Sequence, residues 1–222
     1  MADATPQPQD LTTLAAVKEA LNPNLPSPAN DDQILQRNIT RCSDSMANYC
    51  SRTFQAQEYT ENRNGYGTVA MRLKRTPAWK LISVTISGWS VPQSTGQLVG
   101  GWFLDDDGNF VYIRGGCNYG LNSGIYTYGI QNVQFVYWAG YLTPGQLLQS
   151  PAPTFPQDPP SMPNDLERAC IEYVILAYRQ ATRIGDTAVG LGPERIQYYM
   201  KSMTPETIQT LNRYADPAYP LS

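Results

Sequence analysis

Apolar residues follow a helical period in the first quarter of the chain. They are separated by steps of four, three, four and three residues: Leu35, Ile39, Cys42, Met46 and Tyr49. This spacing places them on one side of a helix, and Asp31 and Asp32 precede them, where acidic side chains stabilise a helix N-terminus. The pattern predicts a helix over about 31–53 whose apolar face packs against other helices.

A second long helix is expected near the end of the chain, over about 164–184. Its apolar residues keep the same period: Leu166, Cys170, Val174, Ala177, Ala181 and Ile184. Three shorter helices are also expected. One ends before Pro23 and is capped by Asp10 or Thr12, one runs from Pro193 to about 202, and one starts at Thr204. These assignments rest on capping residues and on proline in the first helical turn.

Between the helical patterns the period changes to two, which is typical of strands. The Asn64-Gly65 step lies between two alternating segments and predicts a hairpin turn. A strand is expected over 81–88, a second hairpin around Asp107-Gly108, and one or two further strands over 125–141. The stretch 151–163 holds six prolines and predicts a linker without regular structure.

These elements predict an α+β protein in which helices from both ends of the chain form one bundle around an inserted antiparallel β-rich section. The expected parts are a flexible tail (1–9), a bundle with the first hairpin (10–88 and 161–202), a β-rich insertion (89–150), a Pro-rich linker (151–160) and a C-terminal helix with an arm (203–222).

The composition removes several classes of function. The chain of 222 residues has no histidine, which excludes Ser-His-Asp and Cys-His catalysis and histidine metal sites. Its net charge is −3 and only 16% of its residues are charged, which argues against a basic nucleic-acid reader. The four cysteines form no CxxC pair, and we interpret them as buried side chains in a reducing compartment. No catalytic residue, cofactor or metal site is predicted.

The chain also lacks targeting signals. No apolar run reaches the roughly 18 residues of a membrane helix, and the N-terminus has no signal-peptide pattern. We therefore expect a soluble protein made in a cytoplasm and not exported by a signal of its own.

The β-rich section is the strongest candidate for an interaction surface. Twelve of the 17 glycines lie between 81 and 150, and only five charged residues lie between 81 and 162. Its tyrosines include Tyr112, Tyr119, Tyr126 and Tyr128. Tyrosine is enriched at interfaces, so this section predicts a carbohydrate-binding face, a protein-binding surface or ordinary sheet packing.

Several segments resemble one family in order and spacing. They are LTTLAAVKEALN, DDQILQRNITRCSDSMANYCSRTF, LISVTISG, NVQFVYWAGY, DLERACIEYVILAYRQATRIG and MTPETIQTLNRYADP. Together, over about residues 10–217, they resemble the head-tail connector proteins of long-tailed double-stranded DNA phages, also called head-completion or adaptor proteins. The β-rich section is longer here than in compact members.

The resemblance implies a structural virion protein of the neck, between capsid and tail, assembled in the host cytoplasm. Such proteins form a ring, usually of twelve subunits, under the portal protein. The ring extends the DNA channel and provides a platform for the next connector or the tail. DNA would pass through without specific binding. In this family the C-terminal segment reaches the portal, which by position implies contacts from Leu211, Tyr214, Pro217, Tyr219 and Leu221.

Two alternatives stay open beside the adaptor. The tyrosine- and glycine-rich section could serve a carbohydrate- or protein-binding module of a tail or baseplate, or it could lie between subunits or face the tail. An enzyme is not expected, because no set of residues supports catalysis.

Overall fold

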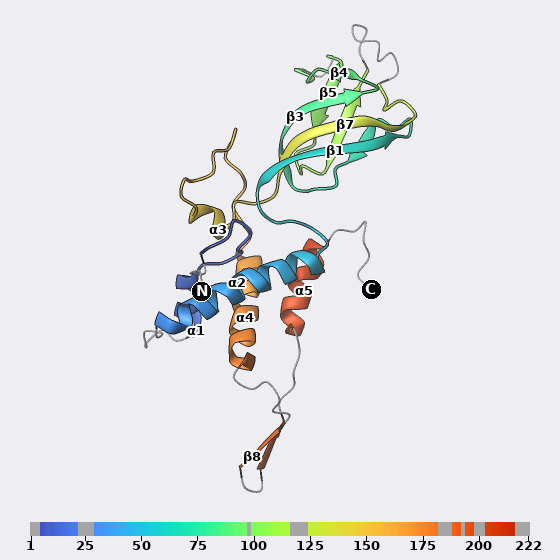
Figure 1. The fold of residues 1–222 in the computed structure, drawn as a ribbon. Coiled ribbons are helices and arrows are strands. Elements are labelled where there is room, and N and C mark those ends of the chain that lie inside the picture. Colours follow the sequence, from blue (N-terminus) through green and yellow to red (C-terminus); the bar gives the residue numbers. More distant parts are fainter. Residues whose placement is uncertain are drawn as a thin grey trace. The chain divides into compact units, whose positions relative to one another are not determined.

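The computed structural model describes residues 5–21, 29–96, 99–115, 124–181, 188–191, 194–197 and 203–215. In chain order, its elements are α1 (Leu14–Leu21), α2 (Ala29–Tyr49), β1 (Gln57–Gly65), β2 (Ala70–Arg72), β3 (Ala78–Ile86), β4 (Trp89–Val91), β5 (Gly101–Leu104), β6 (Phe110–Arg114), β7 (Gly129–Ala139), α3 (Pro144–Leu147), α4 (Asn164–Ala181), β8 (Ala188–Leu191), β9 (Glu194–Gln197) and α5 (Pro205–Tyr214). Figure 1 labels most of these elements. The α+β class expected from the sequence is confirmed.

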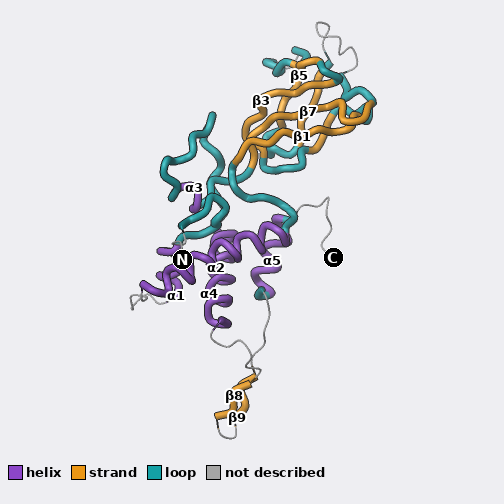
Figure 2. The backbone as a smooth tube through the Cα atoms, viewed as in Figure 1, coloured by secondary structure: helices purple, strands orange, loops and turns teal. Residues whose placement is uncertain are grey.

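The chain divides into two compact units. A helical unit combines residues 1–54, 143–154 and 161–222, and a β unit combines 55–142 and 155–160. The described helices belong to the first unit and β1 to β7 to the second; Figure 2 colours the helices purple and the strands orange. The β unit starts at Gln55, so it is larger than the insertion over 89–150 that the sequence predicts, and it includes the segments around the expected first hairpin.

In the helical unit, α4 packs against α1, α2 and α5. The apolar stripe of α2 forms much of this core, with Leu35, Ile39 and Met46 fully buried. Helix α2 ends at Tyr49, four residues earlier than the period predicts. At the start of α1 the cap is Thr13, whose Oγ1 accepts a hydrogen bond from Ala16 N at 3.2 Å; neither Asp10 nor Thr12 has this role.

The N-terminal segment is fastened to α2 and α3 by polar contacts. Gln36 Nε2 donates to the buried carboxylate of Asp10 at 2.7 Å, and Gly145 N donates to Asp10 O at 3.0 Å. Thr143, which caps α3, donates from Oγ1 to Pro8 O at 2.6 Å. Gln149 Nε2 also donates to Pro6 O at 2.9 Å, so residues from 6 onward are part of the folded helical unit.

The β unit holds two antiparallel sheets around one core. The strand order is β1-β7-β3-β4 in the larger sheet and β2-β6-β5 in the smaller. Phe135 and Val84 from the larger sheet and Val111 from the smaller are fully buried in the same apolar cluster. The hairpin around Asp107-Gly108 is confirmed, since β5 pairs with β6 and Asp105 Oδ1 accepts from Asn109 N at 2.7 Å.

The hairpin predicted at Asn64-Gly65 is wrong. β1 runs through both residues and pairs with β7, whereas β2 pairs with β6 in the other sheet. Gly65 is needed for close packing, because a Cβ there would lie 1.8 Å from Thr127 O. The two-residue turn occurs instead between β3 and β4, where Ser87 and Gly88 have φ values of 50° and 83°, as a type I′ turn requires.

The helix predicted from Pro193 to about 202 is also wrong in the part that the structure describes. Residues 194–197 form β9, which pairs antiparallel with β8. A proline can occupy the first turn of a helix, but it does not make the following residues helical. A short helix is marginally stable without packing of an apolar face. The helix expected over about 164–184 is confirmed as α4 over Asn164–Ala181, while 182–184 lie outside the described residues, and the helix expected from Thr204 is confirmed as α5.

Candidate interaction surfaces

The described residues contain no grouping of three or more His, Cys, Asp or Glu side chains that could hold a metal ion. Among the described helices, none combines the length and the hydropathy that crossing a bilayer requires. Cys42, Cys50 and Cys170 are free and buried. Burial raises the pKa of Cys42 to about 12 and that of Cys50 to about 11, so these thiols are poor nucleophiles at neutral pH.

Helix α5 carries the first of the residues expected to contact a portal. Thr204 Oγ1 caps the helix by accepting from Thr207 N at 3.1 Å. Leu211 is fully buried, and its carbonyl accepts from Cys50 Sγ at 3.5 Å. The Leu211 side chain therefore belongs to the core of the helical unit, where α5 packs on α4, although the resemblance implies a portal contact for it by position.

Tyr214, the next expected contact, is half-buried and bonded within the helical unit. Its hydroxyl donates to Asp165 Oδ1 at 2.6 Å, and its carbonyl accepts from Arg52 NH1 at 3.1 Å. The ring meets Phe54 edge to face, with 6.4 Å between centroids. Pro217, Tyr219 and Leu221 lie outside the described residues.

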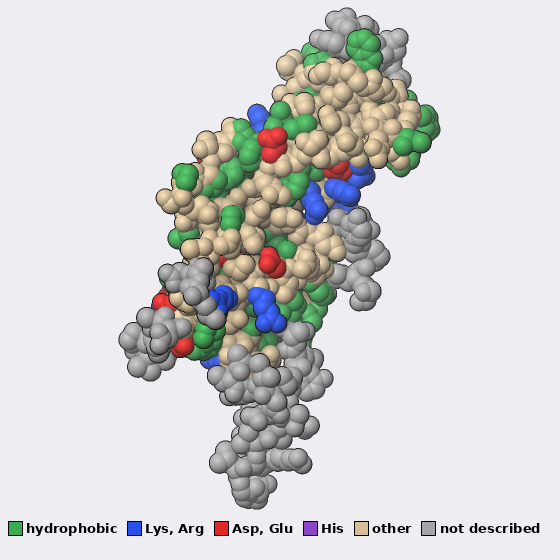
Figure 3. Space-filling model, viewed as in Figure 1, with side chains coloured by type: hydrophobic (Ala, Val, Ile, Leu, Met, Phe, Trp, Pro, Cys, Tyr) green, Lys and Arg blue, Asp and Glu red, His purple; other side chains and the backbone are tan. Residues whose placement is uncertain are grey.

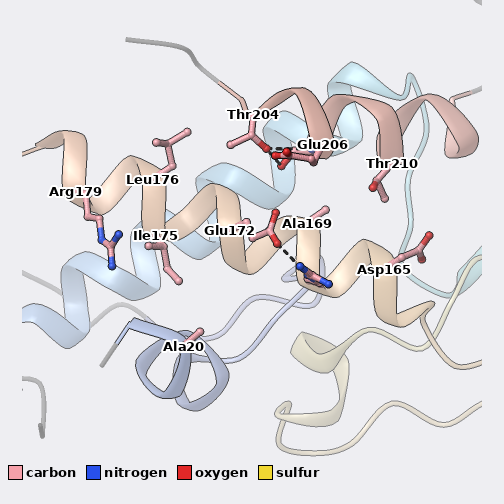
Figure 4. A pocket seen from close by; sticks show the side chains of 12 residues that line it. Ala20, Asp165, Ala169, Glu172, Ile175, Leu176, Arg179, Thr204, Glu206 and Thr210 are labelled. Carbon is pink, nitrogen blue, oxygen red and sulfur yellow. Dashed lines mark hydrogen bonds and ion pairs between the residues drawn. The ribbon is translucent and has the colours of Figure 1, made fainter. Parts of the chain in front are cut away.

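A groove lies between α1, α4 and the start of α5 (Figure 4). It has a volume of about 830 Å³. Half-buried Ile175 and Leu176 form its apolar part, and an ion pair between Arg168 and Glu172, 2.9 Å from Nε to Oε1, lies at its rim. Because the lining combines apolar and charged side chains, the groove suits packing against a protein segment.

The tyrosines expected on the β surface differ in how exposed they are. Tyr126 is fully buried and donates to Val111 O at 2.9 Å, so it is a core residue. Tyr112 is half-buried and stacks on Phe103 with 5.1 Å between ring centroids. Tyr128 is 80% exposed. Tyr119 lies outside the described residues.

Three exposed residues near Tyr128 were missed by the sequence reasoning. Tyr66, Trp89 and Ile130 are 60%, 78% and 88% exposed. They lie at the same end of the β unit as Tyr128, because Gly65 pairs with Gly129 and Ile86 pairs with both Val133 and Trp89. We call these four residues the tip patch. Figure 3 shows hydrophobic side chains gathered at this end. The available signal was the absence of charge near them, but the sequence alone does not place these four residues together.

Hydrogen bonds from Asn132 join the segments that carry the tip patch. Asn132 Oδ1 accepts from Gly65 N at 2.8 Å, and Asn132 Nδ2 donates to Thr127 O at 2.9 Å. The Asn132 carbonyl accepts from Ser87 N at 2.6 Å. Gly65 and Thr127, next to Tyr66 and Tyr128, and Ser87, two residues before Trp89, are thereby all bonded to Asn132.

No protein-family model and no curated protein matches the chain. Solved structures do. A chain from the neck of an empty GTA particle, computed with C6 symmetry, is 12% identical with a TM-score of 0.53, over 96% of this chain and 94% of that one. A chain from the neck of the native GTA particle, computed with C12 symmetry, has a TM-score of 0.51 over 96% and 93%. A chain from the virion of the native gene transfer agent (GTA) particle also has a TM-score of 0.51. This similarity shows a shared fold.

Proposed function

We propose that this protein is a structural component of a phage-like neck, the adaptor that forms a ring under the portal. The observation that carries the proposal is the shared fold with chains from the neck of GTA particles over nearly the full length of both chains. The C6 and C12 symmetries belong to those particles. A ring of twelve copies of this chain is part of the proposal.

The low net charge supports this function. A ring around DNA must let the duplex slide, and a net charge of −3 avoids the counterion-release affinity that a cationic channel would have. The low charge content suits a chain that buries much of its surface against neighbours. The ring would extend the DNA channel and present a platform for the next connector or the tail.

We place the proposed portal contact in a narrower segment than the resemblance implies. Leu211 is in the core and the Tyr214 hydroxyl is bonded to Asp165, so we assign the contact to residues beyond Ala215, with Pro217, Tyr219 and Leu221 as its apolar groups. Removing residues 203–222 would not test this assignment, because it would also remove α5 from the helical unit.

The test is co-sedimentation with DNA-filled heads that carry the cognate portal but lack connectors. We would compare the full chain with a chain ending at Ala215 and with the double variant Tyr219→Ser/Leu221→Ser, using Ser222→Ala as the matched control. Saturable binding of the full chain and of Ser222→Ala near the portal's subunit number is expected, with at least about a tenfold loss for the other two.

Two results would count against parts of the proposal. Absence of binding by the full chain would reject the adaptor role under the portal. Normal binding by the chain ending at Ala215 would keep the adaptor role but reject the assignment of the portal contact to the arm.

A further inference from the structure

The tip patch has no structural task inside the β unit. Tyr66, Trp89, Tyr128 and Ile130 are 60–88% exposed, whereas the core of this unit is built by other residues. Clustered exposed apolar side chains mark interaction sites. We infer that the tip patch is the surface by which this protein contacts an uncharged apolar surface of the next neck or tail protein. This inference rests on the proposed function and names the site and chemistry of one contact.

The patch is preorganised for binding. The Asn132 side chain bonds to Gly65 N and Thr127 O, and its carbonyl bonds to Ser87 N. The Tyr128 ring also lies over Gly67, where a Cβ would come within 2.6 Å of Cε2. A fixed backbone under aromatic side chains reduces the entropy that binding must remove.

The chemistry of the patch selects a protein partner. No Asp, Glu, Lys or Arg occurs in 64–69, 87–91 or 126–132, so nothing in these segments would attract a phosphate backbone. Ile130, its most exposed member, is aliphatic, which suits an apolar protein surface better than the hydroxyl groups of a sugar. The amides of Asn64 and Asn132, which could recognise hydroxyl groups, are bonded to Gln131 N and Gly65 N. An uncharged patch requires an uncharged apolar counterpart.

The patch is small for a stable interface between two proteins. Its size therefore indicates a partner that several copies of this chain contact at the same time. Three exposed aromatic side chains and one isoleucine present roughly 600 Å², less than the roughly 800 Å² per partner of a stable one-to-one interface. Contact between two tips would form a closed two-fold pair, which a ring does not use. Repeated copies around a ring would strengthen a weak single contact by effective concentration.

The experiment is restoration of tailed particles in an extract. Cells producing the particle without this protein would supply heads and tails, and purified full chain would be added. We would compare wild type with Trp89→Ser/Tyr128→Ser/Ile130→Ser. The matched control is Leu147→Ser/Leu148→Ser, which removes hydrophobic side chains 66% and 52% exposed on the helical unit. Head binding would be measured by co-sedimentation and complete particles counted by electron microscopy.

The expected result is that the tip variant binds heads within about twofold of wild type but restores at least about tenfold fewer tailed particles, while the control variant restores them normally. Three outcomes would overturn the inference: full restoration by the tip variant, a wild-type dimer in sedimentation that the tip variant abolishes, or saturable glycan-array binding lost in the variant. Failure of wild type to bind heads would instead reject the proposed function.

Discussion

The helical unit and the β unit are built from the chain in opposite ways. The helical unit joins three separate stretches, whereas the β unit is nearly one continuous stretch. Polar contacts tie distant stretches of the helical unit together: Tyr49 OH donates to Asn212 Oδ1 at 2.8 Å and Tyr178 OH to Asp31 Oδ2 at 2.8 Å. Only five charged residues lie between 81 and 162, and the β unit leaves several aromatic side chains exposed. The helical unit therefore depends on both chain ends, and the β unit does not.

Two signals can be followed separately in the intact protein. All four tryptophans, Trp79, Trp89, Trp102 and Trp138, lie in the β unit. The described helices lie in the helical unit. Tryptophan emission therefore reports on the β unit, and circular dichroism at the helical band reports on the helical unit.

The largest effect is expected from a chain that ends at residue 202. It lacks α5, and with it the buried Leu211 and Thr207 and the hydrogen bond from Tyr214 to Asp165. Because domains are stable by only about 5–15 kcal/mol, we expect the cooperative helical transition to be lost while tryptophan emission stays native. A chain ending at Ala215 is the control and should melt like wild type. An unchanged helical midpoint in the shorter chain would contradict the comparison.

A large-to-small substitution in either core should destabilise only its own unit. It should therefore shift either the tryptophan emission or the helical circular dichroism to lower urea, but not both. Phe135→Ala removes a fully buried ring that packs edge to face on Tyr126 at 5.8 Å and should cost about 3–5 kcal/mol in the β unit. Leu166→Ala, also fully buried, should cost about 2–5 kcal/mol in the helical unit. Urea melts followed by both signals measure the two effects. Equal shifts of both signals by either variant would show that the two units unfold as one.

Alkaline pH should weaken the helical unit first. Burial raises the pKa of the Cys42 thiol from 9.0 to about 12 and that of Cys50 to about 11, and also raises that of Cys170. Above pH 9 the unfolded chain loses these protons and the folded chain keeps them, so stability falls as pH rises toward 11–12. The loss is about 1 kcal/mol per thiol at pH 10.

The β unit should respond about one pH unit later. Its buried tyrosines, Tyr126 and Tyr137, have pKa values raised above the ordinary 10.0, mainly by burial. Urea melts at pH 8, 9 and 10 would show the order. Cys42→Ala should reduce the alkaline loss of the helical unit by about 1 kcal/mol, although it lowers stability at pH 8. If the urea midpoint from tryptophan emission falls at a lower pH than the helical midpoint, the expected order is wrong.

The contrast between the units also explains what the sequence could predict. Helical periodicity is local, so α2 and α4 were predictable from Leu35, Ile39, Leu166 and Cys170. Strand partners are distant, and the Asn64-Gly65 step suggested a turn where Gly65 instead allows Thr127 to approach. The tip patch needed the pairing of β1 with β7 to bring its residues together. Leu211 showed a different difficulty, because the resemblance implied a portal contact for it by position, and position alone does not show that its side chain is buried in the helical unit.

The smallest effect is expected from the cap of α5. Thr204→Ala removes the acceptor for Thr207 N, and losing such a cap costs about 1 kcal/mol. The helical midpoint should fall by that amount while tryptophan emission stays unchanged. Gln209→Ala, at an exposed position on the same helix, is the control. It should change neither the helical midpoint nor the tryptophan emission, since glutamine and alanine have similar helix propensities. An unaffected helical midpoint in Thr204→Ala would mean that α5 is held by Leu211 and Tyr214 alone, and a shift of the tryptophan signal would mean that the end of the chain also stabilises the β unit.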